Sequence, residues 1–355
     1  MSARRFASVA ALVALLAGCA TAPYQAPETA GPPPQAGAVL KSVAIDPALE
    51  ERILALDPDH ITAADVRDTL GKAPAPRIVL IHGGIYPVYL AMSSFAQFLV
   101  GMGYPERELR RPDNVLDSFY SYSPYQDSRE LAGLIAWYYE RDGMRPMIIG
   151  HSQGGVQAVK VLDELAGIFG EDIDVWNPVT DQSEHRTTIV DPLTGQRRPV
   201  VGLTVCYVSA VGAGGAALLL PNQWSMVHRL HTIPDTVDDF TGFSISGDLV
   251  ALTFAGAKGA AEYHANGKAK VRNVFLPAQY NHVVMPATRD LAQREAMRAW
   301  LDAYVPGKPG QAETMPAGAN DGALWAADVW YSIKKHWCLE LQRLIRTRRA
   351  ALAAQ

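Results

Sequence analysis

Met147-Ile148-Ile149-Gly150-His151-Ser152-Gln153-Gly154 is the stretch of this chain that decides its fold. Its first three residues form a short apolar run that predicts a buried strand, and the apolar periodicity of residues 155–165 predicts a helix after it. A serine between two glycines at such a junction is typical of a nucleophile elbow, a tight turn that exposes the serine hydroxyl. The glycines are needed because strand and helix approach each other too closely there for side chains. We therefore expect Ser152 to act as a nucleophile.

A second apolar run leads into a pair of glycines. Residues 77–81 read Arg-Ile-Val-Leu-Ile, which predicts a buried parallel strand, and His82-Gly83-Gly84 follows directly. Acyl transfer develops negative charge on the substrate's carbonyl oxygen, and backbone amides at these two turns are the groups that bind it. The candidate donors of this oxyanion hole are the amides of Gly84 and Gln153. Standing alone, the two glycines would be interpreted as a simple strand-to-helix turn.

A serine hydroxyl needs a neighbouring base to take its proton. Three histidines follow the region where the supporting acid is expected, namely His264, His282 and His336. His264 precedes an Asn-Gly pair that predicts a hairpin turn, and His336 falls in a predicted C-terminal helix. His282 instead comes shortly after the strand-like run 271–276, where a base at the end of a strand should lie. We predict His282 as the base, with a structural histidine as the alternative.

The absence of carboxylates narrows the choice of acid. Residues 201–234, which hold an expected strand and a long loop, contain no aspartate or glutamate, so the acid must come later. Aspartates at 235, 238 and 239 crowd an expected polar turn, where they would be solvated or cap a helix. Asp248 ends the strand-like run 243–247, whose last residue is a glycine that permits a bend. We predict Asp248 as the acid, with Asp239 as the alternative.

The order serine, acid, histidine along the chain is that of the α/β-hydrolases. Residues 77–287 resemble an α/β-hydrolase of the lipase and esterase kind, with Ile81-His82-Gly83-Gly84 similar to its oxyanion strand and residues 150–154 to its elbow. One departure is that Ile85 follows Gly84, so the match is with the shorter His-Gly type of oxyanion motif. The resemblance implies a mostly parallel central sheet with helices on both faces, and hydrolysis of a carboxylic ester.

The elements between these motifs fit an α/β fold. Helices are expected at 89–102 and 126–141, with a strand at 120–122 between them, which gives the alternation of a parallel sheet. Residues 173–199 break this rhythm after the nucleophile helix and form an expected insertion, with a hairpin at 187–200 that turns at Thr194-Gly195. We expect one domain from residue 41 to 355, with its core at 77–305.

Two apolar segments have alternative interpretations. Residues 216–221, followed by Trp224 and Met226, are too apolar for a free surface loop, so they are either core or the lining of an acyl pocket. Residues 324–351 form an expected amphipathic helix, which we predict to pack on the domain rather than on a membrane.

The N-terminus predicts where the protein works. Arg4 and Arg5 precede an apolar stretch too short to span a bilayer, which is typical of an export signal over residues 1–18. Leu16-Ala17-Gly18-Cys19 resembles the bacterial lipoprotein box, which implies lipidation of Cys19; a plain secretory signal is the alternative. No aspartate follows Cys19, which implies the periplasmic side of the outer membrane in a Gram-negative cell. Residues 19–40 are rich in proline and alanine and predict a solvated tether.

Composition excludes several other classes of function. The formal net charge is −4 and 48 % of the residues are apolar, as in a globular enzyme. The basic cluster 343–349 ends the predicted C-terminal helix and is too small for a nucleic-acid surface. His228 and His231 are three residues apart, but no third ligand follows at a recognisable spacing, so we expect neither metal nor cofactor. Cys206 and Cys338 are expected to be two free buried thiols rather than a disulfide.

These observations predict a lipid-anchored serine hydrolase that cleaves a carboxylic ester. Ser152 would attack, His282 would carry the proton, and Asp248 would hold the imidazole. The expected partners are an ester substrate and the membrane, with no nucleic acid. An acyltransferase with the same triad, or a catalytically silent lipoprotein that binds an envelope component, are the alternatives.

Overall fold

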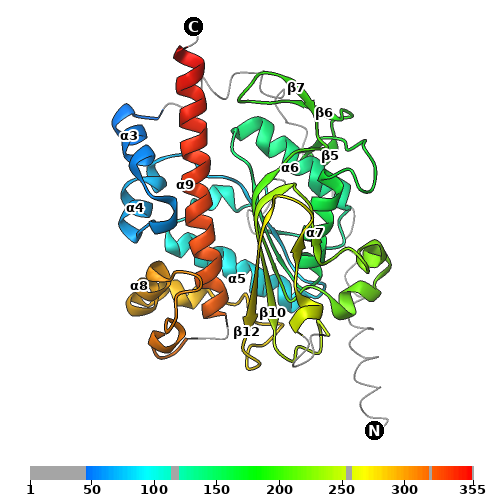
Figure 1. Ribbon diagram of the computed structural model, residues 1–355, viewed down its shortest axis with the longest axis vertical. Helices are drawn as coiled ribbons and strands as arrows, with labels where there is room; N and C mark the ends of the chain where they lie inside the picture. Colours follow the sequence, from blue (N-terminus) through cyan, green and yellow to red (C-terminus); the bar gives the residue numbers. More distant parts are fainter. Residues whose placement is uncertain (1–44, 113–119, 253–257, 320–321, 354–355) are drawn as a thin grey trace.

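The computed structural model describes residues 45–112, 120–252, 258–319 and 322–353. The predicted signal peptide, Cys19 and the tether lie outside these residues. A six-stranded sheet occupies the centre of the molecule, in the order β12-β10-β8-β3-β1-β2, and every neighbouring pair is parallel (Figure 1). Its strands are β1 Ile78–Ile81, β2 Ser121–Tyr122, β3 Met147–His151, β8 Val205–Val211, β10 Val237–Ile245 and β12 Lys270–Leu276. The predicted parallel α/β sheet is therefore confirmed.

The sheet separates two hydrophobic cores. In the parallel pairing of β1 with β3, Leu80 lies opposite Ile149 and Val79 opposite Ile148. Successive side chains on a strand point to opposite faces, so the first pair joins one core and the second pair joins the other. All of these side chains are buried, which explains why both strands are apolar throughout rather than alternating.

Helices cover both faces of the sheet, as predicted (Figure 1). One face packs against α3 Pro47–Ala55, α4 Ala63–Asp68, α5 Tyr86–Met102, α8 Glu295–Ala303 and α9 Ala323–Ala353. The other packs against α6 Ser128–Asp142 and α7 Gln153–Leu165. The connecting 3-10 helices are η1 Pro58–His60, η2 Leu70–Lys72, η3 Glu106–Glu108, η4 Gly215–Leu219, η5 Pro221–Met226, η6 Lys258–Ala261, η7 Arg289–Gln293 and η8 Ala312–Thr314.

Two helices begin a few residues away from the predicted positions, because the residues at their N-termini favour those starts. The helix expected from residue 89 begins at Tyr86, since the proline after it fits the first turn of a helix. The helix expected from residue 126 begins at Ser128, where the Asp127 carboxylate accepts a hydrogen bond from the backbone N–H of Arg129 at 2.9 Å.

The insertion after α7 contains two small hairpins. β4 Trp176–Asn177 pairs antiparallel with β5 Gln182–Ser183, and β6 Thr188–Val190 with β7 Arg197–Pro199. The second is the hairpin expected at 187–200. Gly195 has a φ of 70°, the left-handed conformation that its turn requires.

Two expectations about loops are wrong, and a third is met only in part. Asp238 and Asp239 lie in strand β10 rather than in a polar turn, and Asp239 is only partly buried beside His336. The Asn-Gly pair at 266–267 makes no hairpin, because β11 His264–Ala265 pairs in parallel with β9 Thr232–Ile233. The segment 216–226, expected to be either core or the lining of an acyl pocket, is divided, since Met226 is fully buried whereas Leu219 and Trp224 are exposed.

The C-terminal helix α9 is part of the core. Its apolar stripe is buried from Trp325 to Ile345, at Trp325, Trp330, Ile333, Trp337, Leu341 and Ile345. The Trp337 indole N–H donates a hydrogen bond to the Pro74 carbonyl at 2.9 Å. No helix within the described residues is both long and apolar enough to cross a membrane. Cys206 and Cys338 are free and buried, as predicted.

Truncating Trp337 should destabilise the whole domain. Trp337→Ala removes a fully buried side chain and leaves a cavity, so we expect the free energy of unfolding to fall by about 3–5 kcal/mol. Urea unfolding followed by circular dichroism measures this. Leu352→Ala on the exposed last turn of the same helix is the control and should change little. Equal, small losses for both variants would show that α9 does not stabilise the core.

Candidate active site

The order of the strands changes direction beside Ser152. From β1 the chain moves outward to β2 on one side, and then returns to β3 on the other side of β1. Helices and loops after β1 and β3 therefore diverge at the carboxyl edge of the sheet, which is where ligands bind in open α/β sheets. His82-Gly83-Gly84 follows β1 and Ser152 follows β3, so the two predicted motifs meet at this point.

Ser152 lies in a tight turn between β3 and α7. Its φ of 56° and ψ of −123° are strained for a residue with a side chain. A methyl group on Gly150 would overlap the Gly154 carbonyl, and one on Gly154 would overlap the Ile81 carbonyl. The backbone N–H of Ser152 donates to the Val211 carbonyl at 2.8 Å, which ties the turn to the neighbouring strand β8. Both glycines are therefore required by contact, as the sequence predicted.

The structure brings the three predicted triad residues together. His282 Nε2 lies 2.9 Å from Ser152 Oγ, and His282 Nδ1 lies 2.6 Å from Asp248 Oδ2. Asp248 follows β10, and His282 follows β12 after a short loop, so all three residues stand at the same edge of the sheet. This is the hydrogen-bonded arrangement in which a histidine can take a proton from a serine hydroxyl.

The Asp248 carboxylate is held in its charged form. Burial by itself raises the pKa of this group, but the hydrogen bond from His282 and the backbone N–H groups of Ala251 and Val250 outweigh burial and lower the pKa. These two N–H groups donate to Oδ1 at 3.1 and 2.8 Å, which leaves Oδ2 for the imidazole. A charged Asp248 keeps the proton of His282 on Nδ1 and leaves Nε2 free to accept one.

Two further residues position His282, and the sequence reasoning missed both. His151 is fully buried, and its Nε2–H donates to the backbone carbonyl of His282 at 2.7 Å. Gly212 follows β8 with a φ of 60°, and a methyl group there would lie 2.8 Å from Cε1 of the His282 ring. Two features of the sequence could have pointed to these residues. His151 lies inside the elbow motif, and Gly212 directly follows a buried strand.

Backbone amides suited to an oxyanion lie beside Ser152. Gln153 begins α7, and the first amides of a helix have no partner within the helix. The loop after β1 lies against Ser152, since a methyl group on Gly83 would come within 3.1 Å of Ser152 Cβ. His82 Nδ1 lies 2.6 Å from the Gly83 carbonyl, so this hydrogen bond orients the peptide group that carries the Gly84 N–H.

The alternative acid and bases lie elsewhere. Asp239 pairs in register with Tyr207 and Lys270 near the starts of their strands, so it stands toward the opposite edge of the sheet from Ser152. Its carboxylate lies 2.9 Å from His336 Nε2, so Asp239 and His336 pair with each other rather than with Ser152 or His282. His264 is exposed on β11.

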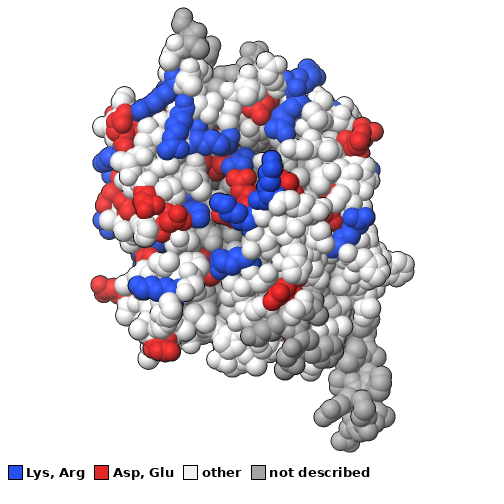
Figure 2. Space-filling model, in the orientation of Figure 1, with Lys and Arg blue, Asp and Glu red and all other residues white. Residues whose placement is uncertain are grey.

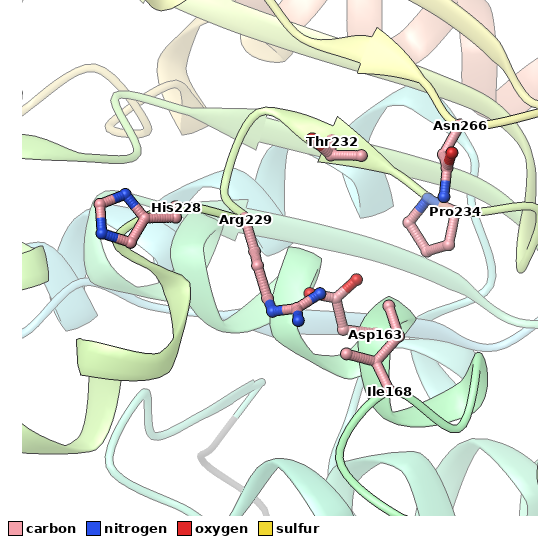
Figure 3. Close-up of a pocket in the computed structure, with 7 residues that line it drawn as sticks. All are labelled: Asp163, Ile168, His228, Arg229, Thr232, Pro234 and Asn266. Carbon is pink, nitrogen blue, oxygen red and sulfur yellow. The ribbon is translucent and has the colours of Figure 1, made fainter.

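His228 belongs to a separate cavity of about 290 Å³. Figure 3 shows the Arg229 side chain directed toward the Asp163 carboxylate there, and burial raises the pKa of Asp163 to about 7. Asp163 lies near the C-terminal end of α7, whereas Ser152 precedes its N-terminal end. The described ranges hold no cluster of three or more His, Cys, Asp or Glu side chains suited to a metal ion.

Comparisons with known proteins leave the site to be judged by its geometry. A scan against protein-family models gives no match, and a search of curated proteins gives none either.

His151 should make the stability of the protein sensitive to acid. Burial, together with the nearby His282, lowers its pKa from 6.5 to about 3. Below pH 6.5 the unfolded chain therefore binds a proton that the folded chain does not, so stability falls as the pH drops from 6.5 toward 3. His151→Gln keeps a donor for the His282 carbonyl without titrating. We expect its free energy of unfolding to fall less steeply than that of the unaltered protein over this range, measured by urea unfolding; parallel curves would contradict the assignment.

Proposed function

We propose that this protein is a serine hydrolase of the α/β-hydrolase type that cleaves carboxylic esters through an acyl-enzyme. The observation that carries the proposal is the continuous chain of hydrogen bonds from Asp248 through His282 to Ser152. The parallel sheet supports it, because a strained serine after its central strand β3 faces a glycine loop after β1. A silent scaffold would have no need of such a strained turn.

In the proposed reaction His282 accepts and then donates a proton in each of two half-reactions. Ser152 Oγ attacks the ester carbonyl while its proton passes to His282 Nε2, and the tetrahedral intermediate forms. The intermediate collapses as the alcohol leaves with that proton, so Ser152 is acylated. Water then attacks the acyl group and gives a proton to the same nitrogen, and the second collapse returns it to Ser152 with release of the acid. Asp248 stabilises the imidazolium that exists between these transfers.

The proposed oxyanion hole consists of the amides of Gly84 and Gln153. Both would donate to the carbonyl oxygen as it gains negative charge, and one such donor stabilises the transition state by about 3 kcal/mol. The dipole of α7 adds positive potential at the same place, since its N-terminus begins at Gln153.

We further propose that the protein is exported and lipid-anchored at Cys19, on the periplasmic side of the outer membrane. The residues Leu16-Ala17-Gly18-Cys19 support the anchor, and the proline-rich residues after it would separate the folded domain from the lipid.

Loss of the nucleophile tests the proposed activity. We expect Ser152→Ala to reduce hydrolysis of p-nitrophenyl butyrate by about 10⁶-fold, and Asp248→Asn by about 10⁴-fold because the imidazole then has the wrong tautomer. A fluorophosphonate probe should label the unaltered protein and not Ser152→Ala. Unlabelled native protein with no esterase activity would favour a silent scaffold that binds an envelope component.

Gly212 offers a test of how His282 is positioned. Gly212→Ala places a methyl group 2.8 Å from the His282 ring, so we expect kcat to fall at least about tenfold with little change in KM. Gly195→Ala is a matched control, because Gly195 also has a positive φ but no atom lies within 4 Å of the added methyl group. Equal kcat values for the two variants would contradict the positioning role.

A further inference from the structure

Exposed apolar side chains gather at the carboxyl edge of the sheet. Eleven large apolar or aromatic residues are exposed among the described residues, and nine of them lie in segments that follow a strand of the central sheet. The most exposed are Leu249 at 78 %, Leu219 at 65 % and Trp224 at 62 %. The two exceptions are Ile168, beyond the C-terminal end of α7, and Leu352, at the end of α9.

These segments carry almost no charge. We call them the uncharged rim, which comprises residues 82–94, 123–126, 212–227, 248–252 and 277–288. Asp248 is their one Asp, Glu, Lys or Arg, and it is buried against His282. In the whole chain 19 % of the residues are of these four types, so the rim is strongly depleted of charged residues. Figure 2 shows Lys and Arg gathered over the upper part of one face, with few charges toward its lower end.

Hydrogen bonds join the five segments of the rim. The Tyr125 hydroxyl donates to the Gly84 carbonyl, and the Asn222 amide donates to the Pro124 carbonyl. These two bonds link the segments after β1, β2 and β8.

The remaining links complete the ring. The Ala216 N–H donates to the Val250 carbonyl, and His282 binds Asp248. Directly after the rim, the Arg289 N–H donates to Ser94 Oγ on α5, so the last segment returns to the first. The five segments of the rim are therefore linked to one another at the edge of the sheet where Ser152 stands.

We propose that the uncharged rim docks this protein on a phospholipid bilayer, with the carboxyl edge of the sheet, where Ser152 stands, turned toward the membrane. Exposed apolar side chains that gather on linked, uncharged segments mark a protein or membrane contact. Exposed Trp224, Tyr86 and Tyr125 fit the boundary of a bilayer, where aromatic side chains with one polar end are favoured. A rim without charge loses no ion hydration when it enters the interface.

The chain outside the described residues favours a membrane over another occupant. Cys19 resembles a lipidation site, and the 19–40 segment is proline-rich. In an extended conformation of about 3.1 Å per residue, such a segment reaches several tens of ångströms, enough for the domain to turn its rim toward the lipid. Docking rests on the proposed function only for the role of Ser152 at this edge of the sheet.

Fluorophores on the intact lipidated protein test the docking. An environment-sensitive probe is attached to Leu219→Cys in the rim or to Leu352→Cys outside it; Cys206 and Cys338 are buried and should not react. The protein is reconstituted in phosphatidylcholine vesicles with or without brominated lipid. We expect a blue shift and quenching at position 219, insensitive to salt, and neither effect at position 352. A probe at 219 that stays in water would overturn the proposal.

Charged substitutions in the rim provide a second test of membrane docking. Leu90→Glu combined with Val227→Glu should abolish the quenching at position 219, whereas Ile168→Glu should not. Hydrolysis of soluble p-nitrophenyl acetate should be unchanged in all of these variants. A blue shift that needs protein concentration rather than vesicles would assign the rim to a second copy of the chain and overturn membrane docking. Docking that persists in a protein without esterase activity would instead refute the proposed hydrolysis alone.

Discussion

The close approach of β3 and α7 at Gly150 and Gly154 is the constraint on which the rest of the site depends. No side chain fits at either position, so the backbone must turn within one residue, and Ser152 takes a positive φ to do so. Such a conformation costs about 1–3 kcal/mol and persists only when the surroundings impose it. Here the surroundings are a fully buried strand that lies between the two cores and a buried helix that packs in one of them.

The two edges of the sheet have opposite characters. Near the starts of the strands, charged groups pair across elements: Arg145 contacts Glu340 and Asp238, and Arg272 contacts Asp328. At the carboxyl edge the pair formed by Asp248 and His282 is surrounded by uncharged loops. A low density of competing charges strengthens that one pair, because fewer ions and less water screen it. The same lack of charge makes this edge suited to contact with an apolar surface.

Much of the site could be predicted because each of its parts follows a recognisable strand. Ser152, Asp248 and His282 each come after an apolar run, and parallel strands end at one edge. Prediction failed where local pattern and tertiary context disagree. The aspartates at 238 and 239 resemble a turn, yet they open strand β10 because ion partners on other elements satisfy them. The Asn-Gly pair at 266–267 resembles a hairpin, yet β11 pairs with the distant β9.

From the sequence alone one could derive the alternation of strands and helices, the elbow, and which residue types could form a triad. These depend on the periodicity of apolar residues and on steric limits within a few residues, which are local properties. Tertiary structure decided that His151 binds the backbone carbonyl of His282, that Gly212 leaves room for the His282 ring, and that five separate loops form one uncharged rim. Those contacts join residues far apart in the chain, so only the order and register of the strands bring them together.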